Sequence, residues 1–380
     1  MSEVYITRIA KFLPNEAVDN SELEVYLGTI NGKPSKSKAI VLRNNGIKSR
    51  YYALTREGVP THTNAEMAAL AIRSLFERDP EQLKNIELLA CATSSPDQLM
   101  PSHAVMVHGE LPETGPIEVV SPSGVCCAGM HAFRYAWMSV KLGERNRAVC
   151  AASERLTPVL KSDQFEDEVT KLASLEKNPV LAFEKDFLRW MLSDGAGAFY
   201  LENKPKEEGI SLRVEWLESF SFAHELEPCM YMGSEKLPDG KLKSYKDYDP
   251  REMIDKSVLS IKQDVKLLGN NIVKVGVDKM VSILRQRGIT PDDIDYFLPH
   301  LSSFFFESKI ADCLVENDYE LVASKWFTNL ATKGNVGAAS IYLMLEELFN
   351  SGRLKKGDRI LISVPESSRF SYVYGYLTVV

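Results

Sequence analysis

Two adjacent cysteines, Cys126 and Cys127, stand where a long apolar, helix-forming segment begins, and a thiol at that place can act as a nucleophile. Unpaired N–H groups and the positive end of the helix dipole stabilise a thiolate in the first turn of a helix. Such a thiolate attacks the carbonyl carbon of an acyl thioester. The alternative role for either residue is that of a small buried hydrophobic side chain.

His300 and Asn335 offer the groups that a second chemical step would need. His300 follows an apolar run that ends in Pro299, and Asn335 lies in the glycine-flanked stretch 333–337. An imidazole N–H and a side-chain amide can donate hydrogen bonds to the negative charge that develops on a thioester oxygen when an enolate forms. The structural alternatives are a hydrogen-bonded loop histidine and an asparagine that caps a helix or forms a turn.

The helices and strands that must position these residues follow the same order in the two halves of the chain. Aligning the two copies places Asn335 opposite Cys127, an offset of 208 residues. Strands alternating with helices predict mostly parallel, buried sheets. A pseudo-twofold axis between the copies would bring Cys127 and Asn335, each at a helix start, to one cleft. The first copy comprises a helix over 64–76 with Asn64 as its N-cap, a strand over 86–95, a helix to residue 142 and a strand over 148–153; the second comprises a helix over 277–285, a strand over 294–303, a helix over 338–349 and a strand over 360–364.

Composition excludes several classes of protein. The chain has 380 residues and a formal net charge of −7, which disfavours general nucleic-acid binding. Its six cysteines form no CxxC pair, so we expect reduced thiols, no zinc site and no disulfide framework. No apolar run reaches the length of a membrane span, and the first residues lack the pattern of a signal peptide, so we expect a cytoplasmic protein.

One basic region contrasts with this acidic balance. Between residues 33 and 56 the chain carries seven basic side chains and no acidic one. Such a region is either a solvated loop or a docking surface for an anionic partner, such as a phosphate-bearing thiol carrier. The docking candidates are Lys36, Arg43, Lys48 and Arg50.

At these residues the chain resembles the β-ketoacyl-acyl-carrier-protein synthase III family of the thiolase superfamily. The resemblance implies an α/β, five-layer αβαβα fold of two duplicated halves (1–205 and 206–380), a homodimer, and a catalytic triad of Cys127, His300 and Asn335. Cys126 would then be a buried neighbour whose side chain points elsewhere. The matching segments are 45–50 (Asn-Gly-Ile-Lys-Ser-Arg), 92–95 with 100–102, 127–129 (Cys-Ala-Gly), 193–198 (Ser-Asp-Gly-Ala-Gly-Ala), 298–300 (Leu-Pro-His) and 334–340 (Gly-Asn-Val-Gly-Ala-Ala-Ser).

The implied reaction is a two-stage condensation. Cys127 takes an acyl group from acyl-CoA or an acyl carrier protein, and His300 and Asn335 then support carbon–carbon bond formation with a second malonyl- or β-ketoacyl-thioester, without a cofactor. The Gly-rich segment 194–198 lacks the spacing of a phosphate-binding loop and is interpreted as the turn that opens a strand. The alternatives are acyl transfer to a hydroxyl or amine and, less favoured, a non-catalytic partner subunit.

The chain departs from the family pattern at two places near the site. His300 is followed by Leu-Ser-Ser in place of Gln-Ala-Asn, and the C-terminal glycine-rich turn is replaced by residues 365–370, Pro-Glu-Ser-Ser-Arg-Phe. We therefore expect an oxyanion hole built from the backbone N–H groups of Cys127 and Ser368. Extra length around 22–38, 161–189 and 227–249 predicts a reshaped substrate tunnel or dimer contact. These departures favour a specialised member, such as the ketosynthases that make dialkylresorcinol-type lipids.

Overall fold

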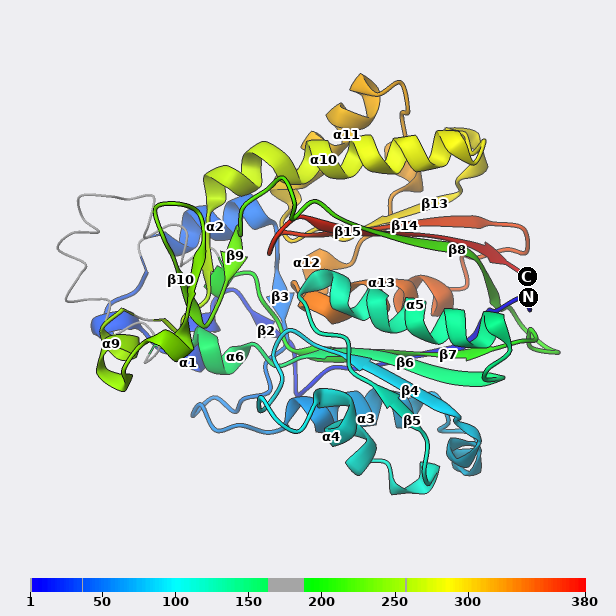
Figure 1. Cartoon of the computed structure of the whole chain (residues 1–380), viewed down its shortest axis with the longest axis horizontal. Helices are drawn as coiled ribbons and strands as arrows, with labels where there is room; N and C mark the ends of the chain where they lie inside the picture. Colours follow the sequence, from blue (N-terminus) through cyan, green and yellow to red (C-terminus); the bar gives the residue numbers. More distant parts are fainter. Residues whose placement is uncertain (1, 36, 163–187, 257) are drawn as a thin grey trace.

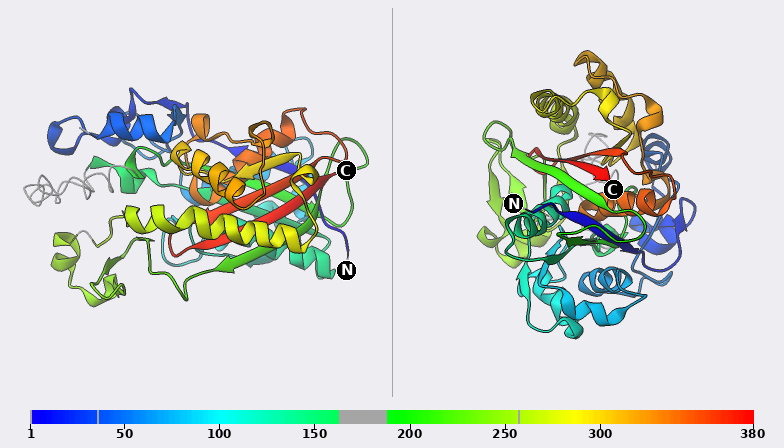
Figure 2. Two further views of the ribbon diagram at one scale, coloured as in Figure 1. Left: turned by 90° about the horizontal axis from the view of Figure 1, so that it is seen from above. Right: turned by 90° about the vertical axis from the view of Figure 1, so that its right-hand side faces the viewer.

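The computed structural model has five alternating layers of helices and strands, and it describes residues 2–35, 37–162, 188–256 and 258–380 (Figure 1). Figure 2 shows the same stacking from the end of the molecule. The predicted αβαβα architecture is therefore confirmed. From one face to the other, the layers are α10 (Val265–Gln286) and α11 (Glu307–Glu316); β8 (Leu212–Ser221), β15 (Ser371–Val379), β14 (Arg359–Glu366) and β13 (Tyr296–Pro299); α5 (Cys126–Leu142) and α13 (Ser340–Asn350); β1 (Tyr5–Phe12), β7 (Gly195–Glu202), β6 (Arg147–Glu154), β4 (Leu88–Ala92) and β5 (Glu118–Val120); α3 (Asn64–Ser74) and α4 (His103–Gly109).

The two strand layers are joined at one edge into a single nine-stranded sheet with the order β13-β14-β15-β8-β1-β7-β6-β4-β5. The joint is narrow, because β1 and β8 pair only at Tyr5–Arg213 and Ile6–Leu212. Each half repeats one pairing scheme: β4 runs parallel to β6, which is antiparallel to β7, and β13 runs parallel to β14, which is antiparallel to β15. The duplication predicted from the sequence is therefore present in the topology.

Three details of the sequence prediction are wrong. The sheet is mixed and not mostly parallel, because the long central pairings of β1, β7, β8 and β15 are all antiparallel. The N-cap of α3 is Thr63, which forms a capping box with Glu66, whereas Asn64 is buried and donates to Thr93 and Ser95. The outer helix of the second half begins at Val265, twelve residues earlier than the apolar pattern indicated.

Close contact between the two halves fixes the helices of the central layer. A Cβ atom on Gly129 of α5 would lie 2.3 Å from the carbonyl oxygen of Ala338, in the short helix η10 (Gly337–Ala339) that leads into α13. The Tyr342 hydroxyl donates to the Gly129 carbonyl oxygen at 2.8 Å. Only glycine allows this approach, so the Cys-Ala-Gly segment has a fixed register against the second half.

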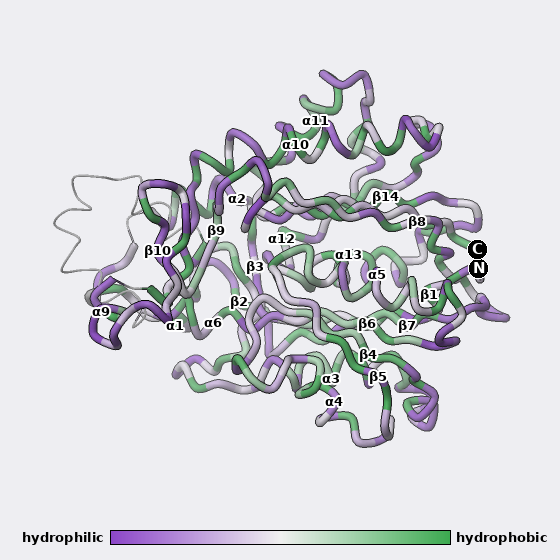
Figure 3. The backbone as a smooth tube through the Cα atoms, viewed as in Figure 1, coloured by the Kyte–Doolittle hydropathy of each residue, from purple (hydrophilic) through white to green (hydrophobic). Residues whose placement is uncertain are grey.

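The remaining elements form a lobe at the end of the molecule away from the two termini (Figure 1). Purple, hydrophilic stretches prevail around β10 and α9, whereas green stretches are concentrated in the layered body (Figure 3). No helix among the described residues is long and apolar enough to cross a membrane. The lobe and its connections comprise β2 (Val18–Asp19), β3 (Ser49–Arg50), β9 (Met230–Tyr231), β10 (Ser234–Lys236), β11 (Leu242–Ser244), β12 (Lys262–Gln263), α1 (Leu23–Leu27), α2 (Lys38–Asn45), α6 (Thr157–Leu160), α9 (Pro250–Asp255) and α12 (Leu330–Lys333).

Candidate active site

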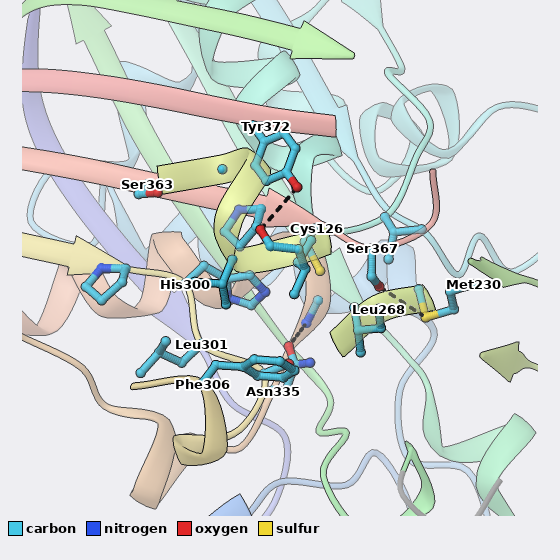
Figure 4. Close-up of a pocket in the computed structure, with 18 of the residues that line it drawn as sticks. Cys126, Met230, Leu268, His300, Leu301, Phe306, Asn335, Ser363, Ser367 and Tyr372 are labelled. Carbon is cyan, nitrogen blue, oxygen red and sulfur yellow. Dashed lines mark hydrogen bonds between the residues drawn. The ribbon is translucent and has the colours of Figure 1, made fainter. Parts of the chain in front are cut away.

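His300 and Asn335 line one pocket, as the duplication predicted (Figure 4). His300 follows the last residue of β13, and its backbone N–H donates to the carbonyl oxygen of Ser363 on β14 at 2.8 Å. Its side chain is buried, and neither ring nitrogen has a hydrogen-bond partner among the described residues. Burial lowers the pKa of His300 to about 4. The imidazole is therefore neutral at pH 7, with one N–H to donate and one nitrogen to accept.

Asn335 presents its amide group in a defined orientation. Its side-chain oxygen accepts hydrogen bonds from the Gly337 N–H at 3.0 Å and the Ser340 hydroxyl at 3.3 Å. Its backbone is held on both sides, because its N–H donates to the Met191 carbonyl and its carbonyl accepts from the Ser193 N–H. With the oxygen engaged, the NH₂ group is the end of the amide that remains for a ligand in the pocket.

The two cysteines at the start of α5 face different surroundings. Cys126 lines the pocket with His300 and Asn335 (Figure 4). Cys127 is fully buried, and its Sγ donates to the Val364 carbonyl oxygen at 3.2 Å. The expectation that the Cys126 side chain points away from the site is therefore wrong. Cys127 follows the pocket-lining Cys126 in the chain, but in this conformation its thiol is directed at the Val364 carbonyl and not at the pocket.

A carboxylate that the sequence prediction did not assign stands at the start of α5. One oxygen of Glu366 accepts from the Val125 N–H at 2.9 Å and the Cys127 N–H at 3.0 Å, and the other accepts from the Ser368 hydroxyl at 2.5 Å. The Cys127 N–H, expected to be an oxyanion donor, is thus already paired. Ser368 contacts Glu366 through its hydroxyl, and its carbonyl oxygen accepts from the N–H groups of Cys229 and Met230.

The thiols are less acidic than the helix start alone predicted. Burial raises the pKa of Cys126, and the negative charges of Glu366 and Glu154 raise it further. Burial likewise raises the pKa of Cys127, followed by the charge of Glu366. Desolvation and a nearby carboxylate therefore outweigh the stabilisation that the helix start gives to a thiolate in the resting protein.

Glu154 is a second buried carboxylate that the sequence prediction missed. It ends β6, and it accepts hydrogen bonds from the Ala338 N–H of η10 and from four groups of the segment 93–95: the Thr93 hydroxyl, the Ser94 N–H and hydroxyl, and the Ser95 hydroxyl. Glu154 and Glu366 are each the eighth residue of their strand, β6 and β14. Shifting the repeat offset by four residues, to the 212 that separates 154 from 366, would have revealed the pair.

Apolar side chains form most of the remaining pocket wall. One face of α10 contributes positions spaced by three or four residues over about three turns of helix. Met191, Phe297, Phe306 and Ile310 add apolar groups from other elements. A mainly apolar cavity that also holds a thiol, an imidazole and an amide suits a ligand with an aliphatic chain and one reactive polar end. The α10 residues are Leu268, Ile272, Val273, Gly276, Val277 and Met280.

The four docking candidates differ in exposure. Arg43 and Lys48 are exposed, and Lys36 lies outside the described residues. Arg50 is buried, and its guanidinium donates to the Asn20 side chain and the Trp190 carbonyl oxygen, both at 2.8 Å. The prediction that Arg50 docks a carrier is therefore wrong, because its charge holds two segments of the fold together.

The Gly-rich segment 194–198 opens β7, as predicted. The buried carboxylate of Asp194 accepts from the N–H groups of Ala53, Leu156 and Thr157 and from the Thr157 hydroxyl. Gly197 packs against Tyr342, since a Cβ atom there would lie 2.5 Å from the tyrosine Cβ.

Within the described ranges, no group of three or more His, Cys, Asp or Glu side chains is arranged to hold a metal ion.

Comparisons with known proteins agree with this geometry. The family model described as 3-Oxoacyl-[acyl-carrier-protein (ACP)] synthase III C terminal matches residues 284–364. A β-ketoacyl-[acyl-carrier-protein] synthase III from Deinococcus radiodurans is 23% identical over 367 residues, covering 96% of this chain and 90% of its own. One from Helicobacter pylori is 25% identical over 360 residues, covering 93% and 92%.

Solved structures show the same fold. AbyA1, a tetronic acid condensing enzyme, superposes with a TM-score of 0.75 at 19% identity over 99% of both chains. Xanthomonas campestris OleA, in crystals with bound lauric acid and lauroyl-CoA, gives a TM-score of 0.73 at 19% identity over 99% of both chains. The chain therefore has the fold of these proteins, the thiolase fold. Over most of its length, the chain is similar to β-ketoacyl-[acyl-carrier-protein] synthase III proteins.

Proposed function

We propose that the protein is a condensing enzyme that joins two acyl thioesters through a new carbon–carbon bond. The observation that carries the proposal is that one apolar pocket contains the Asn335 amide, a helix-start thiol and His300, whose ring nitrogens have no partner in the part of the chain that the structure describes. Two donors without other partners suit an enolate oxygen, which needs hydrogen bonds at the moment the charge forms. Simple acyl transfer does not require the second donor.

In the first step, a cysteine at the start of α5 attacks an acyl thioester, the carbon–sulfur bond to the carrier breaks, and the carrier thiol leaves with the proton. We assign this role to Cys127. The assignment rests on the Cys-Ala-Gly segment, whose register is fixed by the approach of Gly129 to Ala338. Attack requires the Cys127 thiol to leave the Val364 carbonyl by rotation about its Cα–Cβ bond. Cys126, on the pocket wall, is the alternative acceptor.

In the second step, a malonyl-type thioester loses carbon dioxide, and its enolate carbon attacks the acyl carbonyl on the cysteine. The electron pair of the broken carbon–carbon bond moves into the enolate, whose oxygen accepts from His300 and Asn335. The new bond releases the cysteine as a thiolate, which regains a proton. A β-ketoacyl thioester would instead form its enolate by losing a proton from the carbon between its two carbonyl groups, with the unprotonated ring nitrogen of His300 as the acceptor, as in dialkylresorcinol-type synthesis.

The apolar wall along α10 favours aliphatic acyl groups, delivered on coenzyme A or on an acyl carrier protein. Exposed Arg43 and Lys48 would meet the phosphate of the carrier arm.

We further propose a homodimer in the cytoplasm. Leu99 and Met100, which are 77% and 85% exposed, are apolar groups that a second subunit would cover.

Replacement of Asn335 by alanine separates condensation from acyl transfer. In Asn335→Ala, self-acylation by an acyl-CoA should persist, because the thiol is intact. Decarboxylation and condensation of malonyl thioester should fall by roughly 10²–10³-fold, the usual effect of losing one oxyanion donor. Intact-mass spectrometry follows the acyl-enzyme, and release of carbon dioxide follows the second step.

Asn329→Ala serves as the matched control, because Asn329 is a buried asparagine of the same half whose amide donates to Leu343 and Glu347 and not to the pocket. It should retain both steps, subject to its stability. If Asn335→Ala condenses at the wild-type rate, the role of Asn335 as a donor to the enolate is contradicted. If the acylated wild-type protein forms no condensation product but transfers its acyl group to added alcohols or amines, the condensing function is contradicted in favour of acyl transfer.

A further inference from the structure

Glu366 occupies the backbone N–H groups at the start of α5, which the proposed reaction needs for the oxygen of the acyl thioester. Its carboxylate accepts from the N–H groups of Val125 and Cys127 at the start of α5. In the proposed function, the Cys127 N–H points at the place where the carbonyl oxygen of the acyl thioester gains negative charge. A single N–H cannot serve both oxygens well, so the carboxylate and the thioester oxygen compete for this position.

We infer that Glu366 occupies the oxyanion position of the resting protein as a place-holder, holds the cysteine thiols of α5 in an unreactive state, and is displaced when an acyl thioester binds. The inference rests on the proposed function for the identity of the displacing group. Glu366 is a positioning residue, because it acts on the reacting thiol and not on the acyl group itself.

The surroundings of Glu366 permit such a displacement. Its side chain is buried but retains 7% exposure, and its neighbours Val125, Cys126, Pro365 and Ser367 line the pocket. Among the described residues it has three hydrogen-bond donors, of which one, the Ser368 hydroxyl, belongs to its own turn and can move with it. Glu154, at the equivalent position of β6, is fully buried and has five donors.

Several titratable groups surround Glu366 on the elements that pack around it. Cys126, Cys127 and the partly buried His131, all on α5, interact with the charge of Glu366, whereas Tyr372 of β15 and Glu154 of β6 lie near Cys127 and Cys126, respectively. Burial lowers the pKa of His131, so at neutral pH it does not supply a compensating cation. The negative charge of Glu366 therefore acts on the thiols without a neutralising partner in that group.

The test compares Glu366→Gln with the wild-type protein. Glutamine keeps the shape, its oxygen can accept from Val125 and Cys127, and its NH₂ can donate to Ser368, but the charge is gone. Alkylation by iodoacetamide from pH 6 to 10, mapped to the peptide that holds Cys126 and Cys127, reports thiolate formation without any thioester. We expect the rate at pH 8 to rise about tenfold and its midpoint to move to lower pH.

Glu144→Gln is the matched control, because it removes one charge just beyond the other end of α5, about 25 Å away. It should leave the alkylation profile unchanged. A second arm measures self-acylation by acyl-CoA below saturation, which should also be faster in Glu366→Gln, since a neutral acceptor holds the N–H groups less strongly than a carboxylate. Thermal unfolding confirms that the variant is folded.

The outcomes are distinguishable. Equal or slower alkylation in Glu366→Gln, in a folded protein that still acylates, contradicts the place-holder role and leaves the condensing function intact. Faster alkylation with no acylation of either protein by any acyl thioester contradicts the proposed function. Faster alkylation together with slower acylation contradicts displacement and would make Glu366 a participant in loading.

Discussion

The two central helices occupy equivalent positions in the two halves, and a buried carboxylate accepts hydrogen bonds from the backbone near the start of each. The two carboxylates differ in how completely they are buried and in how many hydrogen bonds they accept. Glu366, at the end of β14, reaches across to the start of α5, and Glu154, at the end of β6, reaches across to η10 before α13. Each half therefore supplies the carboxylate that caps the helix of the other half. This crossed arrangement ties the halves together at the place where the thiols, His300 and Asn335 meet.

The difference lies in how completely each carboxylate is surrounded. Glu154 is fully buried and joins the segment 93–95 to η10, the short helix that follows Asn335 and Val336. Glu366 borders the pocket and has fewer partners. Glu154 thus has a structural role, whereas Glu366 is placed to affect the reaction.

The largest expected effect separates the two glutamates by stability. Glu154→Ala would leave up to five buried donors without an acceptor, so the free energy of unfolding should fall by at least about 3 kcal/mol. Glu366→Ala removes a helix cap beside a pocket that water can enter and should cost about 1 kcal/mol. Urea unfolding measures both. Equal losses would contradict the division into a structural and a chemical carboxylate.

The next effect concerns pH and two buried histidines, one from each half. Burial lowers the pKa of His103 and of His300 to about 4, from 6.5 in the unfolded chain. The unfolded chain therefore binds these protons first, and stability falls as the pH drops from 6.5 to 4, by up to about 3 kcal/mol for each histidine. Above pH 6.5 neither contributes any pH dependence.

His300→Gln should remove its share of this acid sensitivity and abolish condensation, whereas His103→Gln should reduce acid sensitivity but spare the chemistry. His103 is paired with the Ser153 hydroxyl at 3.0 Å and does not line the pocket. Chemical unfolding at pH 4.5 and 7 provides the stability data. If stability is flat between those values in the wild-type protein, the lowered pKa of the two histidines is contradicted.

The smallest expected effect concerns the exposed basic residues that are proposed to dock the carrier. Arg43→Glu and Lys48→Glu should raise the KM for a carrier-bound substrate a few-fold, because exposed charges mainly affect encounter and are screened by salt. Arg50→Ala should instead lower stability, since the guanidinium holds Asn20 and Trp190. A KM that does not change in either charge reversal would remove Arg43 and Lys48 from the docking proposal.

Repeated patterns made most of the fold predictable. The offset that aligned Cys127 with Asn335 identified the duplicated helices and strands, and a resemblance in short segments supplied the layers. Periodicity could not supply the antiparallel pairing of β1, β7, β8 and β15, because strand direction is decided by long-range contacts. The early start of α10 was missed because its first turns pack against the lobe and not only against the sheet.

The site was predictable in its residue types but not in its orientations. His300 and Asn335 fall where the repeat placed them. The rotamers of Cys126 and Cys127 depend on what occupies the start of α5, and Glu366 comes from a strand more than 230 residues away. The position at a helix start alone predicted a thiol with a low pKa. In the structure, burial and the carboxylate of Glu366, which is distant in the sequence, raise the pKa of both thiols.

The most direct test of the account maps the acyl group after incubation with an aliphatic acyl-CoA, in the wild-type protein and in Cys126→Ala and Cys127→Ala. We predict an adduct on the peptide that begins α5, present in Cys126→Ala, absent in Cys127→Ala, and discharged into a longer β-keto product when malonyl thioester is added. An adduct lost only in Cys126→Ala would move the nucleophile to the pocket-facing thiol. No adduct on either cysteine, with any acyl thioester, would contradict the condensing mechanism itself.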